Sequence, residues 1–141
     1  MYEIGQVFQH DFSSELISEM TGRPCLNGHE LQVSGNLPTA RLATGDAFIG
    51  DAAIRDQLAR DADLRDMEGA AVAAVARDFG IPVTLLKQVS DNADEGAMAT
   101  WFDAVDAGAK ELFQVMLTHG FLAWIRKQHP FNVKGCCGVR G

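Results

Sequence analysis

Asp46, Glu68 and Asp91 each stand where a strand-like apolar segment gives way to a loop or a helix. In open α/β sheets, ligands bind in the crevice outside the carboxyl ends of the strands. Carboxyl groups collected there can transfer protons or accept hydrogen bonds from a ligand. Acids at strand ends also serve as helix N-caps, so the pattern leaves a shared polar site and three separate caps as alternatives.

Strand-like and helical segments alternate along the chain, which predicts an α/β layered fold in a single domain. A first strand is expected within residues 4–8, and residues 21–38, with their Gly, Pro and Asn, are expected to be irregular. Asp51 can cap a short helix on which Ile54 and Leu58 form one narrow apolar stripe.

The clearest unit runs from residue 64 to residue 89. After a short strand, the alanine-rich run 70–79 favours a helix, because alanine is the best helix former. Gly80 supplies the left-handed position that follows a helix, and Pro82 prevents the helix from resuming. A buried strand over residues 83–89 would complete a β-α-β unit, which implies parallel strands.

A last helix is expected after the loop at residues 92–97, and it is expected to end at Gly120. Its apolar side chains fall on one stripe, which consists of Trp101, Val105, Ala109, Leu112, Phe113, Met116 and Leu117. We expect this stripe to belong to the core and not to a ligand site.

Composition narrows the classes of partner. The chain has 141 residues, 47% of them hydrophobic, and a formal net charge of −7, so it can form one domain with a core. That charge argues against a nucleic-acid or anionic-membrane surface and favours a small neutral or cationic ligand. The first residues lack the features of a signal peptide, and no segment reaches the roughly 18 apolar residues that span a bilayer. A cytoplasmic location is therefore expected.

The cysteines and the end of the chain suggest no further site. Cys25 stands alone, Cys136 and Cys137 are adjacent, and none has the C-x-x-C spacing of redox or zinc sites, so reduced thiols without function are expected. From His119 onward the chain has no acid, and its basic residues are Arg126, Lys127, Lys134 and Arg140.

Three motifs in order resemble the nucleoside phosphorylase and nucleosidase superfamily. They are Thr-Gly-Asp-Ala-Phe-Ile at 44–49, Asp-Met-Glu-Gly-Ala-Ala-Val-Ala at 66–73 and Val-Ser-Asp-Asn-Ala-Asp at 89–94. The similarity is closest to bacterial 5′-methylthioadenosine/S-adenosylhomocysteine nucleosidases and covers about residues 3 to 118.

The resemblance implies a three-layer αβα fold, in part, with a central mixed sheet flanked by helices. It divides the chain into a partial nucleoside phosphorylase-like domain at 1–118 and a divergent basic tail at 119–141. Family members normally begin with a further third, which carries a catalytic glutamate and a Gly-rich segment. Neither motif is found in this sequence, so the chain by itself is expected to be impaired or inactive.

The resemblance assigns Asp91 as the general acid that protonates the leaving purine at N7, with Ser90 orienting it. It assigns Glu68 to the 2′- and 3′-hydroxyls of the ribose, where its charge also stabilises a developing oxocarbenium ion, and Met67 to packing against the sugar. Without the resemblance, Asp91 would be a loop cap, Glu68 a first-turn acid favoured by the helix dipole, and Met67 ordinary core.

Phe48 resembles the aromatic residue that stacks on adenine, and the backbone of Ile49 resembles the part that reads the adenine edge. Otherwise both are packing residues. Asp46 is expected to shape the turn that presents Phe48, and His10 with Asp11 is expected to be structural because no further ligands stand at metal spacing.

The predicted function is hydrolysis of the N-glycosidic bond of methylthioadenosine or S-adenosylhomocysteine, which serves methionine salvage. The resemblance implies no metal or organic cofactor and a homodimer, with residues 12–17 as candidate interface. Two alternatives remain. One is a nucleoside phosphorylase that uses phosphate in place of water. The other is a non-catalytic fragment that binds nucleosides or associates with full-length subunits.

Overall fold

The computed structural model of the chain describes residues 1–94, 96–121 and 123. In chain order its elements are β1 (Tyr2–Gln9), α1 (Ser14–Thr21), β2 (Gly28–Glu30), β3 (Thr39–Thr44), α2 (Ala52–Leu58), β4 (Leu64–Asp66), α3 (Gly69–Asp78), β5 (Leu86–Lys87) and α4 (Ala97–Thr118). Most of the predicted tail, residues 119–141, lies outside the described residues, and so do Cys136 and Cys137.

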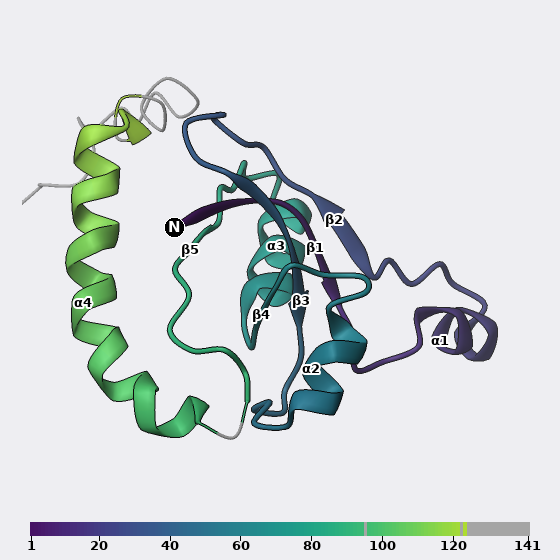
Figure 1. Cartoon of the computed structure of the whole chain (residues 1–141). Coiled ribbons are helices and arrows are strands. Elements are labelled where there is room, and N and C mark those ends of the chain that lie inside the picture. Colours follow the sequence, from purple (N-terminus) through teal and green to yellow (C-terminus); the bar gives the residue numbers. More distant parts are fainter. Residues whose placement is uncertain (95, 122, 124–141) are drawn as a thin grey trace, which may run out of the picture.

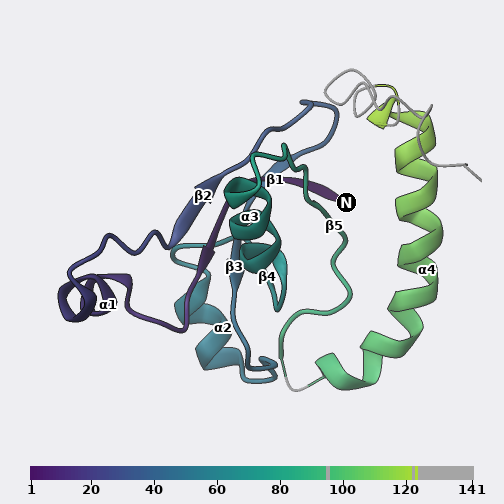
Figure 2. The same ribbon diagram turned by 180° about the vertical axis from the view of Figure 1, so that it is seen from behind.

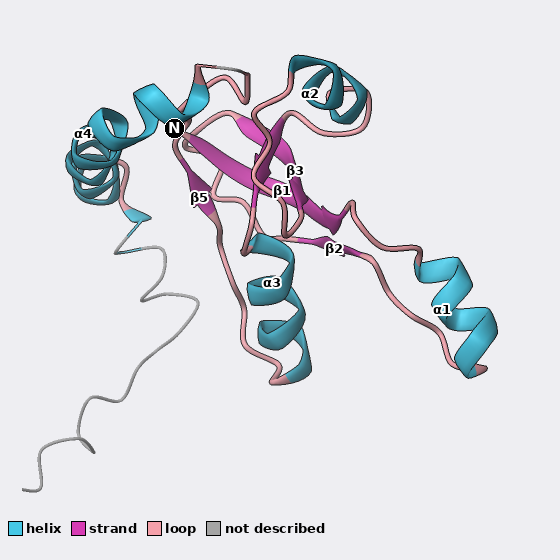
Figure 3. Ribbon diagram, turned by 90° about the horizontal axis from the view of Figure 1, so that it is seen from below, coloured by secondary structure: helices cyan, strands magenta, loops and turns pink. Residues whose placement is uncertain are grey.

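The strands form one mixed sheet, as the family resemblance implied. Its order is β2-β1-β3-β4, with β1, β3 and β4 parallel and with β2 and β5 antiparallel to β1. Helix α3 lies on one side of the sheet and α2 on the other (Figure 3). Helices α1 and α4 lie toward opposite ends of the molecule, with the sheet between them (Figures 1 and 2). The α/β layered architecture is therefore confirmed.

The core lies between the two central strands and α3. Ile4 and Val7 of β1 and Leu42 of β3 are fully buried against α3, where Ala70 and Ala73 are also buried. The small alanine side chains let this helix approach the sheet closely, so its burial, more than its helix propensity alone, fixes it in place.

The predicted helix ends are confirmed. Asp51 caps α2 by accepting hydrogen bonds from the N–H groups of Ala53 and Ile54 at 2.7 and 3.2 Å. Gly80 follows α3 with φ 64°, and Gly120 follows α4 with φ 70°, both in the left-handed region.

The predicted parallel strand over residues 83–89 is wrong. Only Leu86 and Lys87 form a strand, and they pair antiparallel with Glu3 and Tyr2 at the beginning of β1. An apolar run shows that a segment is sheltered, but it does not distinguish a strand paired along its length from a chain that packs on the core. Here Leu85 packs against the core cluster.

Two elements were not predicted from the sequence, α1 and β2. Helix α1 begins after Ser13, whose side chain accepts from the N–H of Leu16 at 3.3 Å, and it ends at Gly22. The segment predicted to be irregular contains β2, which pairs with β1. The three residues of β2 are too few to give an alternating pattern in the sequence.

The apolar stripe of α4 is not core in the described structure. Trp101, Val105, Phe113 and Leu117 are 41 to 59% exposed. The helix stands beside β5, apart from the rest of the sheet (Figures 1 and 2). At Gly108 the helix lies close to the segment after β5, because a Cβ there would collide with the side chain of Gln88. The stripe pattern predicted the helix correctly and its burial wrongly, because periodicity does not reveal what covers a face.

Within the described residues, no helix is long and apolar enough to cross a membrane. The same part of the chain contains no group of three His, Cys, Asp or Glu side chains that could hold a metal ion.

Candidate active site

A cavity of about 830 Å³ lies at the ends of β4 and β5, between α2 and the beginning of α4. This volume is in the range of small-molecule sites. All six predicted site residues line it: Phe48, Ile49, Met67, Glu68, Ser90 and Asp91. They come from three loops that follow β3, β4 and β5, so the fold brings together residues that are distant in the sequence.

The apolar side chains that line the cavity differ in solvent exposure. Ile49 is buried, whereas Phe48 is 46% and Met67 41% exposed. Large apolar side chains at the wall of a cavity offer surface to a flat, apolar ligand, which would cover them on binding.

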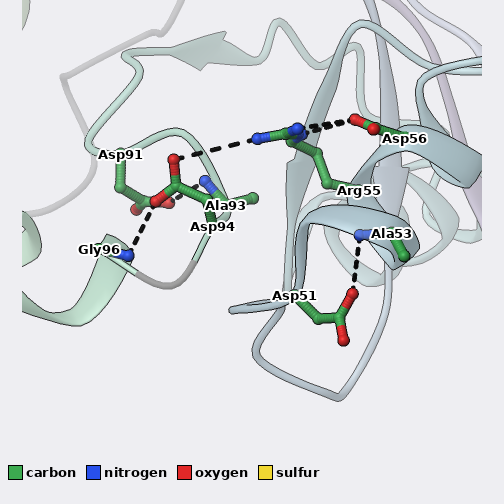
Figure 4. Close-up of polar contacts among 8 residues, drawn as sticks. All are labelled: Asp51, Ala53, Arg55, Asp56, Asp91, Ala93, Asp94 and Gly96. Atoms are coloured by element: carbon green, nitrogen blue, oxygen red, sulfur yellow. Dashed lines mark hydrogen bonds and ion pairs between the residues drawn. The ribbon is translucent and has the colours of Figure 1, made fainter.

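Asp91 holds the turn that follows it while it lines the cavity. Its Oδ1 accepts a hydrogen bond from the N–H of Ala93 at 2.8 Å, and its Oδ2 accepts one from the Ser90 hydroxyl at 2.7 Å (Figure 4 shows the contact with Ala93). Ala93 has φ 52°, which a non-glycine residue rarely adopts. The capping role and a place in the cavity are therefore compatible.

The loop after Asp91 is tied to α2. Asp94 accepts from the N–H of Gly96 at 2.9 Å, and its other oxygen lies 4.0 Å from the guanidinium of Arg55, which also pairs with Asp56 (Figure 4). This ion pair connects two walls of the cavity.

Glu68 is the N-cap residue of α3, but its side chain makes no capping hydrogen bond. Among the described residues, its carboxylate also has no hydrogen-bond or ion-pair partner. The side chain is exposed and lines the cavity, next to the positive end of the helix dipole.

The third strand-end acid, Asp46, does not line this cavity. Its N–H donates to Oδ2 of Asp11 at 2.7 Å, and that bond is the main cause of the lowered pKa of Asp11. The ring of His10 fills the space over Gly45, where a Cβ would collide with it. These contacts belong to the turn after β3, in keeping with the structural roles expected for His10, Asp11 and Asp46.

Asp66 lines the same cavity, although the sequence analysis assigned it no role. Its carboxylate is 9% exposed and lies 2.5 Å from Nζ of Lys87. It also accepts from the hydroxyl of Thr44 at 2.6 Å and from the N–H of Gly69 at 2.8 Å. No local motif indicated this role, because Thr44 and Lys87 are both more than 20 residues away from Asp66 in the sequence.

A second residue missed from the sequence is Arg65, which lines the cavity and donates to the carbonyl of Gly45 at 3.2 Å. Burial lowers the pKa of its guanidinium, and the negative charges of Asp66, Asp11, Asp91 and Glu68 oppose that shift.

A smaller cavity of about 440 Å³ lies between β2, α3 and the segment after it, and none of the predicted site residues lines it. Its wall includes His29, whose pKa is lowered by burial and by the positive charge of Arg77.

Comparison with known proteins gives three matches of interest. The family model described as the phosphorylase superfamily matches residues 8–119. The 5′-methylthioadenosine/S-adenosylhomocysteine nucleosidase of Shewanella oneidensis is 31% identical over 124 residues, which cover 82% of this chain and 50% of that protein. The aminodeoxyfutalosine nucleosidase of Helicobacter pylori is 54% identical over 39 residues, 28% of this chain and 16% of that protein.

Among solved structures, the 5′-methylthioadenosine/S-adenosylhomocysteine nucleosidase of Helicobacter pylori matches with a TM-score of 0.60 and 27% identity, over 72% of this chain and 51% of that one. It was solved in complex with an aminopyrrolopyrimidine linked to a thioether-substituted pyrrolidinol. The chain thus spans about half the length of these Shewanella and Helicobacter methylthioadenosine/S-adenosylhomocysteine nucleosidases.

Proposed function

Because the chain belongs to the phosphorylase superfamily, we propose that its larger cavity binds a purine nucleoside and serves hydrolysis of the N-glycosidic bond. The substrate proposed is 5′-methylthioadenosine or S-adenosylhomocysteine, with adenine released. The observation that carries the proposal is the convergence of six residues from three loops on one cavity. The names of the similar nucleosidases support the type of reaction.

Asp91 would protonate the purine leaving group. Its Oδ1 is occupied as acceptor by the N–H of Ala93, so a proton on this carboxyl group would be on Oδ2, beside Ser90. A serine hydroxyl can donate or accept, so Ser90 can bond to either protonation state. Asp91 would give this proton to N7 of the purine as the glycosidic bond breaks.

Glu68 would bind the ribose. Because its carboxylate has no hydrogen-bond partner in the described structure, both oxygens are available to the 2′- and 3′-hydroxyls of the ribose. Hydrogen bonds to a charged acceptor are stronger than neutral ones, and the negative charge would stabilise an oxocarbenium-like transition state. Met67 would cover the apolar face of the sugar.

Phe48 and Ile49 would bind the purine ring. The half-exposed ring of Phe48 would stack on the purine and become covered on binding. The backbone of Ile49, held by its buried side chain, would bond to the edge of the base.

Activation of the water has no obvious agent among the described residues. Of the carboxylates that line the cavity, Asp63 is paired with Arg41 and Asp66 with Lys87. Glu68 and Asp91 have the roles given above. Since general base catalysis contributes about 10²- to 10⁴-fold, we expect slow turnover from these 141 residues alone.

We further propose that the protein functions in methionine salvage in the cytoplasm, and as a homodimer. The candidate interface at residues 12–17 includes the first turn of α1, where Leu16 and Ile17 are exposed. Exposed apolar side chains on one short helix are suited to contact with a second copy.

The test is release of adenine from 5′-methylthioadenosine by the purified chain, with and without phosphate. The variants are Asp91→Asn and, as a matched control with the same change of charge, Asp61→Asn in the turn before β4. Slow release without phosphate that Asp91→Asn abolishes and Asp61→Asn preserves would support the nucleosidase. Release that requires phosphate would identify a phosphorylase, and no release from folded protein would favour the non-catalytic alternative.

A further inference from the structure

One nearly buried carboxylate joins four elements at the edge of the larger cavity. Asp66, the last residue of β4, accepts from Thr44 at the end of β3 at 2.6 Å and from the N–H of Gly69, the first residue of α3, at 2.8 Å. Its Oδ2 also lies 2.5 Å from Nζ of Lys87, the last residue of β5. A salt bridge with this little exposure is costly to break on one side, because the remaining charge has no partner.

These contacts replace the missing cap of α3. The first N–H groups of a helix have no partner within the helix and need one elsewhere. Gly69 donates to Asp66, and Ala70 donates to the hydroxyl of Thr44 at 2.9 Å. The N-cap residue Glu68 therefore does not bend back onto its own helix, and its carboxylate remains available on the cavity side.

The same carboxylate links the two segments that carry the proposed functional acids. Glu68 is two residues beyond Asp66, and Asp91 is four residues beyond Lys87. The Asp66–Lys87 pair holds the ends of β4 and β5 together, although these strands are not paired with each other in the sheet. The position of one acid relative to the other thus depends on this pair.

We propose that Asp66 is a positioning residue of the site. By holding Thr44, Gly69 and Lys87, it fixes the beginning of α3 so that the Glu68 carboxylate faces the sugar of a bound nucleoside. The identity of that ligand rests on the proposed function. In this role Asp66 acts through Glu68, because its own oxygens are occupied by Thr44, Gly69 and Lys87.

The test compares a ligand that has a sugar with one that lacks it. Affinities for 5′-methylthioadenosine and for adenine are measured by titration calorimetry in an Asp91→Asn background, so that the nucleoside is not cleaved. Adding Asp66→Asn should weaken nucleoside binding by about tenfold to a hundredfold, because hydrogen bonds from the sugar to the charged Glu68 would be lost. The affinity for adenine, which has no sugar, should change by no more than about twofold. Asp78→Asn, which breaks the exposed pair with Arg77 at the other end of α3, should change neither affinity.

Thr44→Val serves as a second variant if Asp66→Asn does not fold. It removes the hydroxyl that bonds to Asp66 and Ala70 at similar side-chain volume, and it should shift the two affinities in the same unequal way. Equal losses for nucleoside and adenine, or unchanged nucleoside binding in folded variants, would overturn the inference.

Amide hydrogen exchange separates this inference from the proposed function. Asp66→Asn should accelerate exchange at Gly69 and Ala70 more than at Phe79, at the other end of the helix. If the parent protein binds neither ligand, the proposed function is contradicted, and faster exchange at Gly69 would still support the role of Asp66 at the beginning of α3. Unchanged exchange at Gly69 and Ala70 would overturn that role whatever the ligand.

Discussion

The hydroxyl of Ser90 donates a hydrogen bond to the carboxylate of Asp91 over 2.7 Å, within the loop that follows β5. The second oxygen of Asp91 is held by the N–H of Ala93. The carboxyl group proposed to protonate the purine is therefore oriented by its nearest neighbours in the sequence, whereas its loop is held by the Asp66–Lys87 and Arg55–Asp94 pairs.

Replacing Ser90 by Ala should lower the rate of adenine release without preventing binding of the nucleoside. The loss of one hydrogen bond that orients the acid should reduce turnover by about threefold to tenfold. Steady-state kinetics would show a fall in kcat with little change in KM. Thr118→Ala, which removes an exposed hydroxyl at the end of α4, is the control, and an equal fall in both variants would speak against the role of Ser90.

Replacing Glu68 by Ala should affect binding but not stability. Because the side chain makes no capping hydrogen bond, the free energy of unfolding should change by no more than about 0.5 kcal/mol, as for surface substitutions. Affinity for the nucleoside should fall by about tenfold or more, and affinity for adenine should not. Urea unfolding and calorimetry measure the two effects, with Glu19→Ala on the exposed side of α1 as control. A large loss of stability would mean that Glu68 is chiefly structural.

Gly69→Ala should destabilise the fold. An added Cβ would lie 2.6 Å from Cδ2 of Leu42 and 2.9 Å from Oδ2 of Asp66, so α3 would have to move away from β3. Overpacking of this kind costs about 1 to 3 kcal/mol. Gly28→Ala is the control, because the nearest neighbour of its new Cβ would be 3.9 Å away. Its midpoint of urea unfolding should be close to that of the unmodified chain. Similar midpoints for both variants would contradict the close approach of α3.

Asp11→Asn should change how stability depends on pH. The hydrogen bond from the N–H of Asp46 lowers the folded-state pKa of Asp11 below the ordinary value of an aspartate in the unfolded chain. The carboxylate therefore contributes stability above that value and loses it as the pH falls through the lower folded-state pKa. The difference in unfolding free energy between the unmodified chain and Asp11→Asn should be largest near neutral pH and should shrink in acid. Glu19→Gln on the exposed side of α1 controls for the change of net charge, and a difference independent of pH would refute the contribution of Asp11.

The sequence predicted the features that depend on local chemistry. The cap at Asp51 and the left-handed Gly80 follow from the conformational preferences of single residues, and both are observed. Family resemblance indicated Phe48, Glu68 and Asp91, which line one cavity although they lie on three different loops.

Features that depend on tertiary contacts could not be predicted from local sequence patterns. The direction of β5 depends on its partner, the beginning of β1, which an apolar run does not identify. The exposure of Trp101 and Phe113 depends on what lies opposite α4. The role of Asp66 depends on Lys87, which is distant in sequence, so no local motif reveals it.

The most direct test of the central claim is to locate the ligand. The 15.3 kDa chain, labelled with nitrogen-15 and carrying Asp91→Asn, would be titrated with 5′-methylthioadenosine while the backbone amide signals are followed by NMR. Binding in the larger cavity predicts saturable shifts at Ile49, Glu68 and Ser90, with little change at His29 and Leu31 in the smaller cavity. Shifts confined to the smaller cavity, or none at saturating nucleoside, would contradict the account.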